Sequence, residues 1–250
     1  MRWLLPCALL ATCPVLWGQT AFSWPQGKRV AVSLSFDDAR ASQVTAGLDL
    51  FERHNAKVTF YLNPRPMERQ LEGWKRAVRL GHEIGNHSAT HPCSGNFPWS
   101  RKNALEDYTM ERLAEDLEAA TRDIEKALGV RPVTFAYPCG SKYVGRGEQT
   151  RSYVPLVARL FLAGRGFRDE AANDPSYADL AQTLGIDSDG MSFEQMRDAV
   201  KAAEAQGAWV VFAGHEIGES GRQTTRIETL EKFLVWAADP ANGVWLDRVD

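Results

Sequence analysis

The 250-residue chain has few cysteines and histidines, four and five respectively, and no strong excess of either charge. A net charge of −3 and a pI near 6.0 give no electrostatic reason to expect a nucleic-acid or anionic-membrane partner. No Pro/Ser-rich linker or low-complexity tract separates one part of the chain from another. These absences favour one globular domain of ordinary composition, 44% hydrophobic and 24% charged.

An apolar stretch at the N-terminus, Trp3–Gly18, follows one basic residue. It is too short and too interrupted by proline to predict stable membrane insertion, and is typical of a secretory signal peptide. We therefore expect residues 1–20 to be a signal peptide and residues 21–250 to form a domain that is secreted or lies in the periplasm or cell envelope. Leu10–Cys13 weakly resembles a lipoprotein cleavage site. A lipid anchor and a buried N-terminal helix of a cytosolic protein are the alternatives.

Strand-like and helix-like segments alternate along the whole chain. Short runs rich in Val, Ile and Phe predict seven strands: Val30–Phe36, Lys57–Leu62, His82–His87, Val133–Tyr137, Leu160–Phe167, Trp209–Gly214 and Val244–Val249. Apolar residues recur at helical spacing between them, and Ser192 with Gln195 fits a capping box. The alternation predicts an α/β fold with a mostly parallel sheet, in a (β/α) barrel-like arrangement.

The first of these strands ends in two adjacent carboxylates, Asp37 and Asp38. Neighbouring carboxylates repel each other, so the pair costs stability unless a cation or hydrogen-bond donors compensate it. The pattern therefore predicts a functional site at the C-terminal ends of the strands, where the active sites of such folds lie.

His87 and His91 follow the third predicted strand and are four residues apart. This spacing would place two imidazoles on one face of a helical turn, a geometry that binds a divalent metal. With Asp38 as a third ligand, these residues predict a His-His-Asp site that keeps positions open for water and substrate.

The pentapeptide Gly-His-Glu-Ile-Gly occurs twice, at Gly81–Gly85 and Gly214–Gly218. His82 enters a predicted strand and is interpreted as structural. His215 leaves a predicted strand, so we expect it to face the active edge.

Four segments in this order resemble the motifs of the polysaccharide deacetylases, carbohydrate esterase family four. They are Ser35–Asp38, His87–His91, Arg131–Gly140 and Phe212–His215. The resemblance covers most of the chain after the predicted signal peptide. It implies a distorted (β/α) barrel of about seven parallel strands and a metal-dependent hydrolase that removes acetyl groups from N-acetylated glycans of the chitooligosaccharide or peptidoglycan type.

Residue by residue, the resemblance implies that Asp37 is the catalytic base and His215 the general acid. The backbone N–H of Tyr137 would help to bind the oxyanion. The implied ligands of a divalent metal, zinc with cobalt, nickel or manganese as alternatives, are Asp38, His87 and His91.

The chain departs from the family pattern at two points. Many members carry an arginine in the third motif that contacts the catalytic aspartate, whereas this chain has Ala136. Arg165 is predicted to supply the missing charge; the alternative is an ordinary surface arginine. The aspartate that orients the acid histidine has no clear match, and Asp187 is the predicted residue, with Asp189 as the alternative.

Phe97, Trp99 and Tyr143 lie in two long loops, where aromatic faces would either stack on sugar rings or pin the loops to the barrel. The expected partner is an acetylated oligo- or polysaccharide, and the sequence leaves the oligomeric state open. An O-acetyl xylan esterase and a non-catalytic carbohydrate-binding pseudoenzyme are the alternatives.

Cys93 and Cys139 each follow a proline beside a motif. Two thiols of an exported protein can pair, but the sequence leaves their bridging open.

Overall fold

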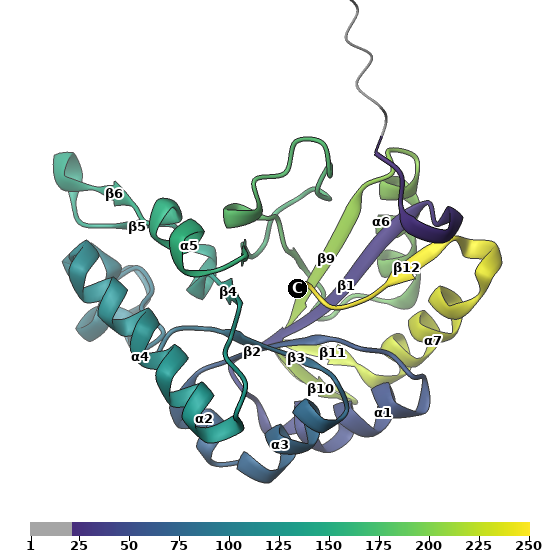
Figure 1. Ribbon diagram of the computed structural model, residues 1–250, viewed down its shortest axis with the longest axis horizontal. Helices are drawn as coiled ribbons and strands as arrows, with labels where there is room; N and C mark the ends of the chain where they lie inside the picture. The colour runs from purple at the N-terminus through teal and green to yellow at the C-terminus, as the bar shows by residue number, and fades with distance from the viewer. Residues whose placement is uncertain (1–21) are drawn as a thin grey trace, which may run out of the picture.

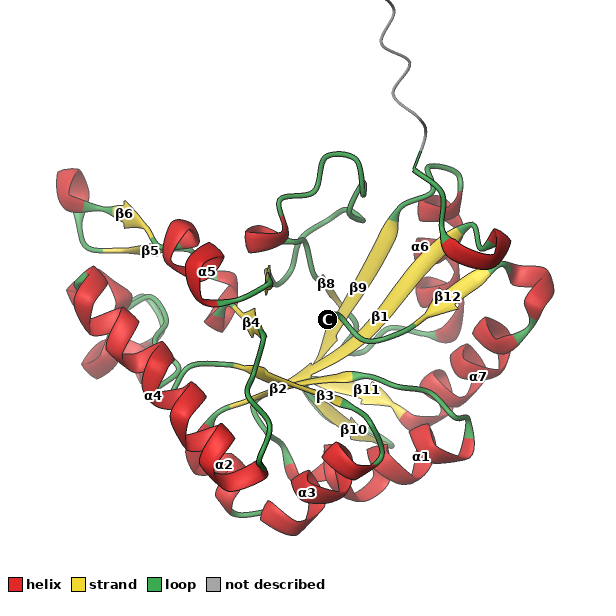
Figure 2. Ribbon diagram, viewed as in Figure 1, coloured by secondary structure: helices red, strands yellow, loops and turns green. Residues whose placement is uncertain are grey.

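The computed structural model describes residues 22–250, and its main feature is a parallel sheet that curls into a distorted barrel (Figures 1 and 2). The predicted signal peptide, residues 1–20, lies outside the described residues. Seven strands form a continuous path in the order β7 (Ala163–Arg165), β4 (Thr134–Ala136), β3 (Glu83–Asn86), β2 (Thr59–Leu62), β1 (Val30–Asp37), β9 (Trp209–Gly214) and β8 (Ile186–Asp187). At one end of this path, Arg165 of β7 forms an isolated bridge with Thr183, which lies in the segment before β8.

Helices surround the outside of the sheet (Figure 2). In the described residues they are α1 (Leu48–Arg53), α2 (Pro64–Glu68), α3 (Leu71–Arg79), α4 (Met110–Leu128), α5 (Val154–Leu160), α6 (Phe193–Glu204) and α7 (Ile227–Ala238). The predicted capping box of Ser192 and Gln195 is confirmed at the start of α6. Thr109 caps the start of α4, and Gly129 ends that helix with a φ of 72°, a conformation that glycine adopts without a Cβ penalty.

Strand β1 sets the arrangement of the core because its side chains alternate between two faces. Val32, Leu34 and Phe36 belong to the main hydrophobic cluster beneath the helices. Ser35 and Asp37 lie on the opposite, inner face, where the Ser35 hydroxyl donates to the carbonyl of Phe212 at 2.7 Å. The interior of the barrel is therefore lined by small and polar side chains, and the chain places its functional groups there.

In the main sheet, the structure differs from the strand predictions at two places. Strand β8 (Ile186–Asp187) is absent from the prediction, because a two-residue strand is too short to show a periodic pattern. The predicted C-terminal strand Val244–Val249 ends earlier, as β12 (Val244–Leu246); it pairs with the first half of β1, whereas β2 pairs with the second half of the same edge. The remaining strands form near their predicted positions, and the predicted parallel α/β barrel architecture is confirmed.

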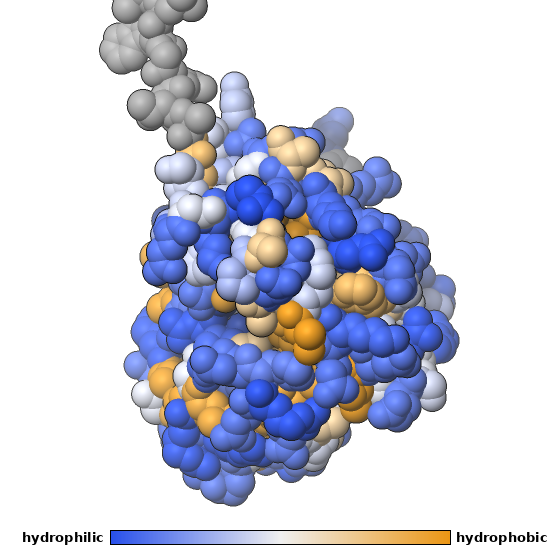
Figure 3. All heavy atoms as spheres, turned by 90° about the vertical axis from the view of Figure 1, so that its right-hand side faces the viewer, coloured by the Kyte–Doolittle hydropathy of each residue, from blue (hydrophilic) through white to orange (hydrophobic). Residues whose placement is uncertain are grey.

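Two short strand pairs lie outside the barrel. β5 (Tyr143–Val144) pairs with β6 (Arg151–Ser152), and β10 (Glu216–Gly218) pairs with β11 (Thr224–Arg226). Hydrophilic side chains dominate the face of the molecule in Figure 3, with apolar ones in small separate groups. Among the described helices, none combines the length and the apolar character that crossing a membrane requires.

Phe60 is the centre of the aromatic part of the core. Its ring lies 6.1 Å from that of Phe36 and 5.4 Å from that of Trp74, measured between centroids, and its exposed fraction is 0%. The Phe60→Ala substitution should lower the free energy of unfolding by about 3–5 kcal/mol, through lost transfer energy and the cavity that remains. Denaturant unfolding measures this value. Val235→Ala, at a side chain exposed on α7, should change it by no more than about 0.5 kcal/mol, and an equal loss in both variants would contradict this description of the core.

Candidate active site

A buried ion pair lies in the interior of the barrel. Asp37, the last residue of β1, accepts a hydrogen bond from the guanidinium of Arg165 at the end of β7. Asp37 is 2% exposed and Arg165 is fully buried. The predicted contact between these two residues therefore forms, and the alternative of a surface arginine is wrong.

The fold brings Arg165 to this position through strand register. Arg165 lies directly opposite Ala136 on the neighbouring strand β4. The positive charge that the third motif lacks is therefore supplied by the adjacent strand, β7. Gly185 packs closely against this segment, because a Cβ at that position would collide with the carbonyl oxygen of Gly166 and approach the Cδ of Arg165 to 2.6 Å. Arg165 also donates to the carbonyl of Gly166 at 2.7 Å, and its guanidinium lies 5.0 Å from the ring centre of Tyr61.

Asp38 follows β1 in the left-handed backbone region, with a φ of 73°, which turns its side chain away from that of Asp37. The buried amide of Gln43 fixes the end of the strand by donating to the carbonyls of Asp37 (2.6 Å) and His215 (2.7 Å). Arg40 contacts the Oδ2 atom of Asp38 at 2.8 Å, which leaves Oδ1 to face the histidines. Sequence reasoning missed both Gln43 and Arg40, since only their position in the folded loop gives them a role.

His87 and His91 both direct their Nε2 atoms at Asp38. The distances to Asp38 Oδ1 are 3.5 Å and 3.4 Å respectively. The expected helical turn is wrong: the segment is an irregular loop in which Ser88 (φ 63°) and His91 (φ 50°) are left-handed. The four-residue spacing brings the imidazoles together all the same, with ring centroids 4.8 Å apart.

The donor set fits a small divalent cation. Two ligand atoms bound at about 2.0–2.1 Å to a tetrahedral zinc are separated by about 3.4 Å, which matches the separations of Asp38 Oδ1 from both histidines. The Nδ1 atom of His87 lies 2.9 Å from the carbonyl of Ala136, the kind of outer contact that orients a ligating imidazole. Asp38, His87 and His91 therefore form one cluster of the predicted ligand types.

The charges of the site keep these groups in the required ionisation states. Burial raises the pKa of Asp37, but Arg165, then His87 and His215, outweigh it and hold the pKa below its usual value. The pKa of Asp38 is likewise held far below its usual value, since the neighbouring histidines outweigh burial. Burial and the nearby His87 lower the pKa of His91 to about 4, so its imidazole is neutral near pH 7, as metal ligation requires.

His215 follows β9 and is oriented by Asp189, which lies just after β8. Its Nδ1 atom is 2.7 Å from Asp189 Oδ2, and its backbone N–H donates to Oδ1 of the same carboxylate at 3.1 Å. The prediction of Asp187 for this contact is wrong: Asp187 pairs with Arg168 at 3.0 Å, and its other oxygen accepts the backbone N–H of Asp189. Asp187 is the last residue of β8, whereas Asp189 lies in the turn that follows, so the end of the strand separates the directions of the two side chains.

The electrostatic effect of Asp189 on His215 is opposed to that of burial. Burial lowers the pKa of His215, but the hydrogen bond to Asp189 and the charges of Asp37 and Asp189 outweigh it, so that the pKa is raised. His215 therefore retains its proton to higher pH than a free imidazole does.

The structure does not support the predicted oxyanion role of Tyr137. Its backbone N–H donates to the carbonyl of Arg165 at 2.9 Å and so continues the pairing between β4 and β7. Its buried hydroxyl donates to the carbonyl of Ala181 at 2.6 Å. The backbone of Tyr137, directly after β4, is thus bonded to β7, the neighbour of β4 in the sheet.

Exposed aromatic side chains lie beside the metal-type cluster. Trp99 is 63% exposed, and its ring lies 6.0 Å from that of His91. Phe97 stacks on Trp99 with 5.6 Å between ring centroids. Tyr143 is also exposed, and it lines a separate shallow pocket of about 210 Å³ with Glu106 and Lys142.

The sequence leaves open whether Cys93 and Cys139 are bridged. In the structure they form a disulfide that joins the loop after His91 to the loop after Tyr137. His82, interpreted as structural, is buried between the rings of Phe51 and Phe60.

Residues 25–153, just over half of the chain, match the family model described as polysaccharide deacetylase. The chain is 42% identical over 66 residues to the peptidoglycan-N-acetylglucosamine deacetylase PgdA of Listeria monocytogenes, which is 26% of this chain and 14% of PgdA. It is 33% identical over 94 residues to the Bacillus subtilis protein YlxY, which is 38% of this chain and 26% of YlxY. The chain thus spans about a quarter or less of the length of these relatives.

Solved structures share the fold. A family 4 acetyl xylan esterase from Clostridium thermocellum, in complex with a cobalt ion, superposes with a TM-score of 0.57 and 18% identity over 88% of both chains. A CE4 family pseudoenzyme from Bacillus anthracis, BA3943, superposes with a TM-score of 0.57 and 19% identity over 88% of this chain and 65% of that one.

Asp189→Asn should lower the pKa of His215, because the substitution removes the charge that stabilises the imidazolium. NMR titration of the His215 imidazole measures this pKa. Asp187→Asn is the matched control: it removes a charge two residues away but keeps an oxygen that accepts the Asp189 N–H. A larger pKa change in the Asp187 variant than in the Asp189 variant would contradict the assignment.

Proposed function

Since the chain belongs to the polysaccharide deacetylase family, we propose that it is a metal-dependent hydrolase that removes acetyl groups from N-acetylated glycans. The observation that carries the proposal is the cluster of Asp38, His87 and His91, which lies near a buried aspartate and a histidine of raised pKa. Each of the three kinds of group that the hydrolysis of an unreactive amide needs is therefore present at the same end of the barrel.

Asp38, His87 and His91 would hold the divalent cation, with zinc as the expected ion and cobalt, nickel or manganese as alternatives. Such a cation supplies Lewis acidity, which lowers the pKa of water from about 15.7 toward about 7 and polarises a carbonyl. The chain's own contribution is to orient the ligands: Arg40 holds Oδ2 of Asp38, and the carbonyl of Ala136 fixes the ring of His87.

Asp37 acts as the general base. Its low pKa keeps the carboxylate ionised at neutral pH, and Arg165 occupies Oδ1, so that Oδ2 is directed toward His87 at 3.9 Å. An isolated carboxylate is a weak base, but Asp37 would be strong enough to accept a proton from a water molecule whose pKa a bound cation lowers. Positioned proton transfer of this kind contributes about 10²–10⁴-fold to rate.

His215 acts as the general acid. Asp189 holds its Nδ1 atom, which leaves Nε2 to protonate the departing sugar amine, and the raised pKa keeps that proton on the ring to higher pH than in a free imidazole. Base and acid thus have pKa values moved apart by their surroundings, as an acid–base pair requires.

A carbohydrate substrate is supported by the exposed pair of Phe97 and Trp99 beside His91, since flat aromatic faces pack against sugar rings. An N-acetylated glycan is supported by PgdA, which is named a peptidoglycan-N-acetylglucosamine deacetylase. Such a substrate lies outside the cytoplasm, in keeping with the proposed secreted or cell-envelope location. An O-acetyl xylan esterase is the second candidate, supported by the acetyl xylan esterase of the same fold.

Measuring acetate release from chitooligosaccharides and acetylxylan side by side, with and without a chelator, tests the proposal. We expect faster release from the N-acetylated substrate, loss of release with chelator and recovery on adding zinc or cobalt. Asp37→Asn should lower kcat by about 10²–10⁴-fold, whereas Asp174→Asn, on an exposed loop, should leave it unchanged.

Each other outcome has a distinct meaning. Chelator-insensitive release that is equal in wild type and the Asp37 variant would refute a metal hydrolase. Tight metal binding without turnover of any acetylated glycan would favour the pseudoenzyme alternative, which has a structural precedent in BA3943.

Arg165 acts as a positioning residue for Asp37. Arg165→Gln should raise the pKa of Asp37, because the guanidinium is the largest influence that lowers it. The ionised carboxylate is the active form, so the acidic limb of the kcat/KM profile should move to higher pH; Arg165→Lys should shift it less. An unmoved acidic limb in a folded Arg165→Gln protein would show that another group tunes Asp37.

A further inference from the structure

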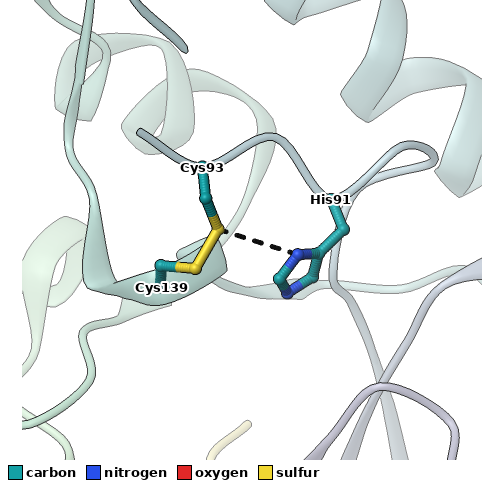
Figure 4. A group of neighbouring side chains, drawn as sticks. All are labelled: His91, Cys93 and Cys139. Atoms are coloured by element: carbon teal, nitrogen blue, oxygen red, sulfur yellow. Dashed lines mark hydrogen bonds between the residues drawn. A yellow bond between two sulfur atoms is a disulfide. The ribbon is translucent and has the colours of Figure 1, made fainter. Parts of the chain in front are cut away.

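The two ligand histidines differ in what holds their second ring nitrogen. The Nδ1 atom of His87 faces the carbonyl of Ala136 at 2.9 Å, whereas the Nδ1 atom of His91 faces the Sγ atom of Cys93 at 3.7 Å (Figure 4). Metal-binding imidazoles usually donate this N–H to a carboxylate, a carbonyl or water. In the described part of the chain, the hydrogen-bond contact of the His91 Nδ1 atom is with a disulfide sulfur.

The same disulfide joins two backbone segments that each contain a residue other than glycine in the left-handed region. His91 has a φ of 50° and lies two residues before Cys93, and Cys139 itself has a φ of 55°. Such conformations are sparsely populated and persist where the surrounding structure enforces them. The Cys93–Cys139 bond closes a loop across 46 residues and is the covalent link between these two segments.

The beginning of the loop has independent support. The side chain of Asn63 donates to the carbonyls of His87 and Ser88, and the backbone N–H of Ala89 donates to Asp116 at 3.0 Å. The end of the loop has such support as well, because the backbone N–H of His91 donates to the Ser88 hydroxyl at 2.9 Å and the backbone N–H and carbonyl of Cys93 both bond to the hydroxyl of Ser100. The two imidazole rings differ instead. The Nδ1 atom of His91 contacts the disulfide sulfur and that of His87 does not, so loss of the disulfide should affect the His91 ring more than the His87 ring.

We propose that the Cys93–Cys139 disulfide is a positioning element for His91. It fixes the loop and the ring so that Nε2 faces Asp38, and the affinity of the cluster for a divalent cation depends on it. The inference rests on the proposed function, in which Asp38, His87 and His91 hold that cation. Cys93 is fully buried but Cys139 is half-buried, so a dithiol has access to one of the two sulfurs.

Reduction by a dithiol would remove the restraint in two steps. A thiolate of the dithiol attacks Cys139 Sγ, which breaks the Cys93–Cys139 bond and releases Cys93 as a thiolate that takes up a proton. The second thiol of the dithiol then displaces Cys139, so the dithiol becomes a disulfide and both cysteines become thiols.

The test compares cobalt binding by wild type and the Cys93→Ser/Cys139→Ser variant, measured by competition with a chromophoric chelator and by the visible spectrum of bound cobalt. Serine at both positions also removes the thiols that, with His91, would otherwise offer a rival donor set. We expect a 10–100-fold weaker affinity, typical of a lost outer contact to a metal ligand, and an altered spectrum.

Val200→Ala, on the buried face of α6, controls for a general loss of stability. It should lower the unfolding temperature without changing cobalt affinity or the spectrum. If the double variant does not fold, treating folded wild type with a dithiol and following hydrogen exchange at residues 88–93 replaces it, and faster exchange there is expected.

Equal affinity and equal spectra in wild type and the folded double variant would overturn the positioning role while leaving the proposed function intact. Unchanged exchange at residues 88–93 after reduction would also overturn it. A wild-type protein that binds no cobalt would instead refute the proposed function and the inference that rests on it.

Discussion

The ion pair between Arg165 and Asp37 is the interaction on which the site depends. Two charges without access to water are costly to bury, and their attraction repays the cost only when the geometry is good and the remaining hydrogen-bonding groups have partners. Here the guanidinium also bonds to the carbonyl of Gly166 and packs against Tyr61, while its buried Nε–H has no hydrogen-bond partner among the described residues. Through this pair, the barrel maintains an ionised carboxylate in its interior, beside a cluster that attracts a cation.

The rest of the site follows from the pleat of the strands. Asp37 ends β1 on its inner face, and Arg165 ends β7 on the same face of the barrel. His87 and His215 are the first residues beyond β3 and β9. The C-terminal ends of parallel strands lie at the same end of the barrel, so residues that are distant in sequence meet there. The helices outside the barrel contribute stability and leave the inner face free for polar groups.

The sequence was sufficient for the parts of the fold that repeat a pattern. Strands such as Trp209–Gly214 are continuous apolar runs, and the capping box of α6 is a local signal. The cluster of Asp38, His87 and His91 was predictable because residue types and order are distinctive. Strand β8 was not predictable, because its two residues pair only through contacts with β9. The choice between Asp187 and Asp189 depended on where that strand ends, since the turn after it places the carboxylate of Asp189 against His215. The occupied N–H of Tyr137 could not be foreseen either, because it depends on where β7 continues.

The register of β4 and β7 has a consequence for how this site can vary among related chains. Positions 136 and 165 lie opposite each other on adjacent strands, and one guanidinium is enough to neutralise Asp37. A chain with arginine at position 136 therefore has no need of one at position 165. Position 185 should stay glycine in both cases, because a Cβ there would collide with the backbone carbonyl oxygen of Gly166. Positions 136 and 165 should therefore covary in homologous sequences, so that the source of the charge moves between strands while the charge itself stays in place.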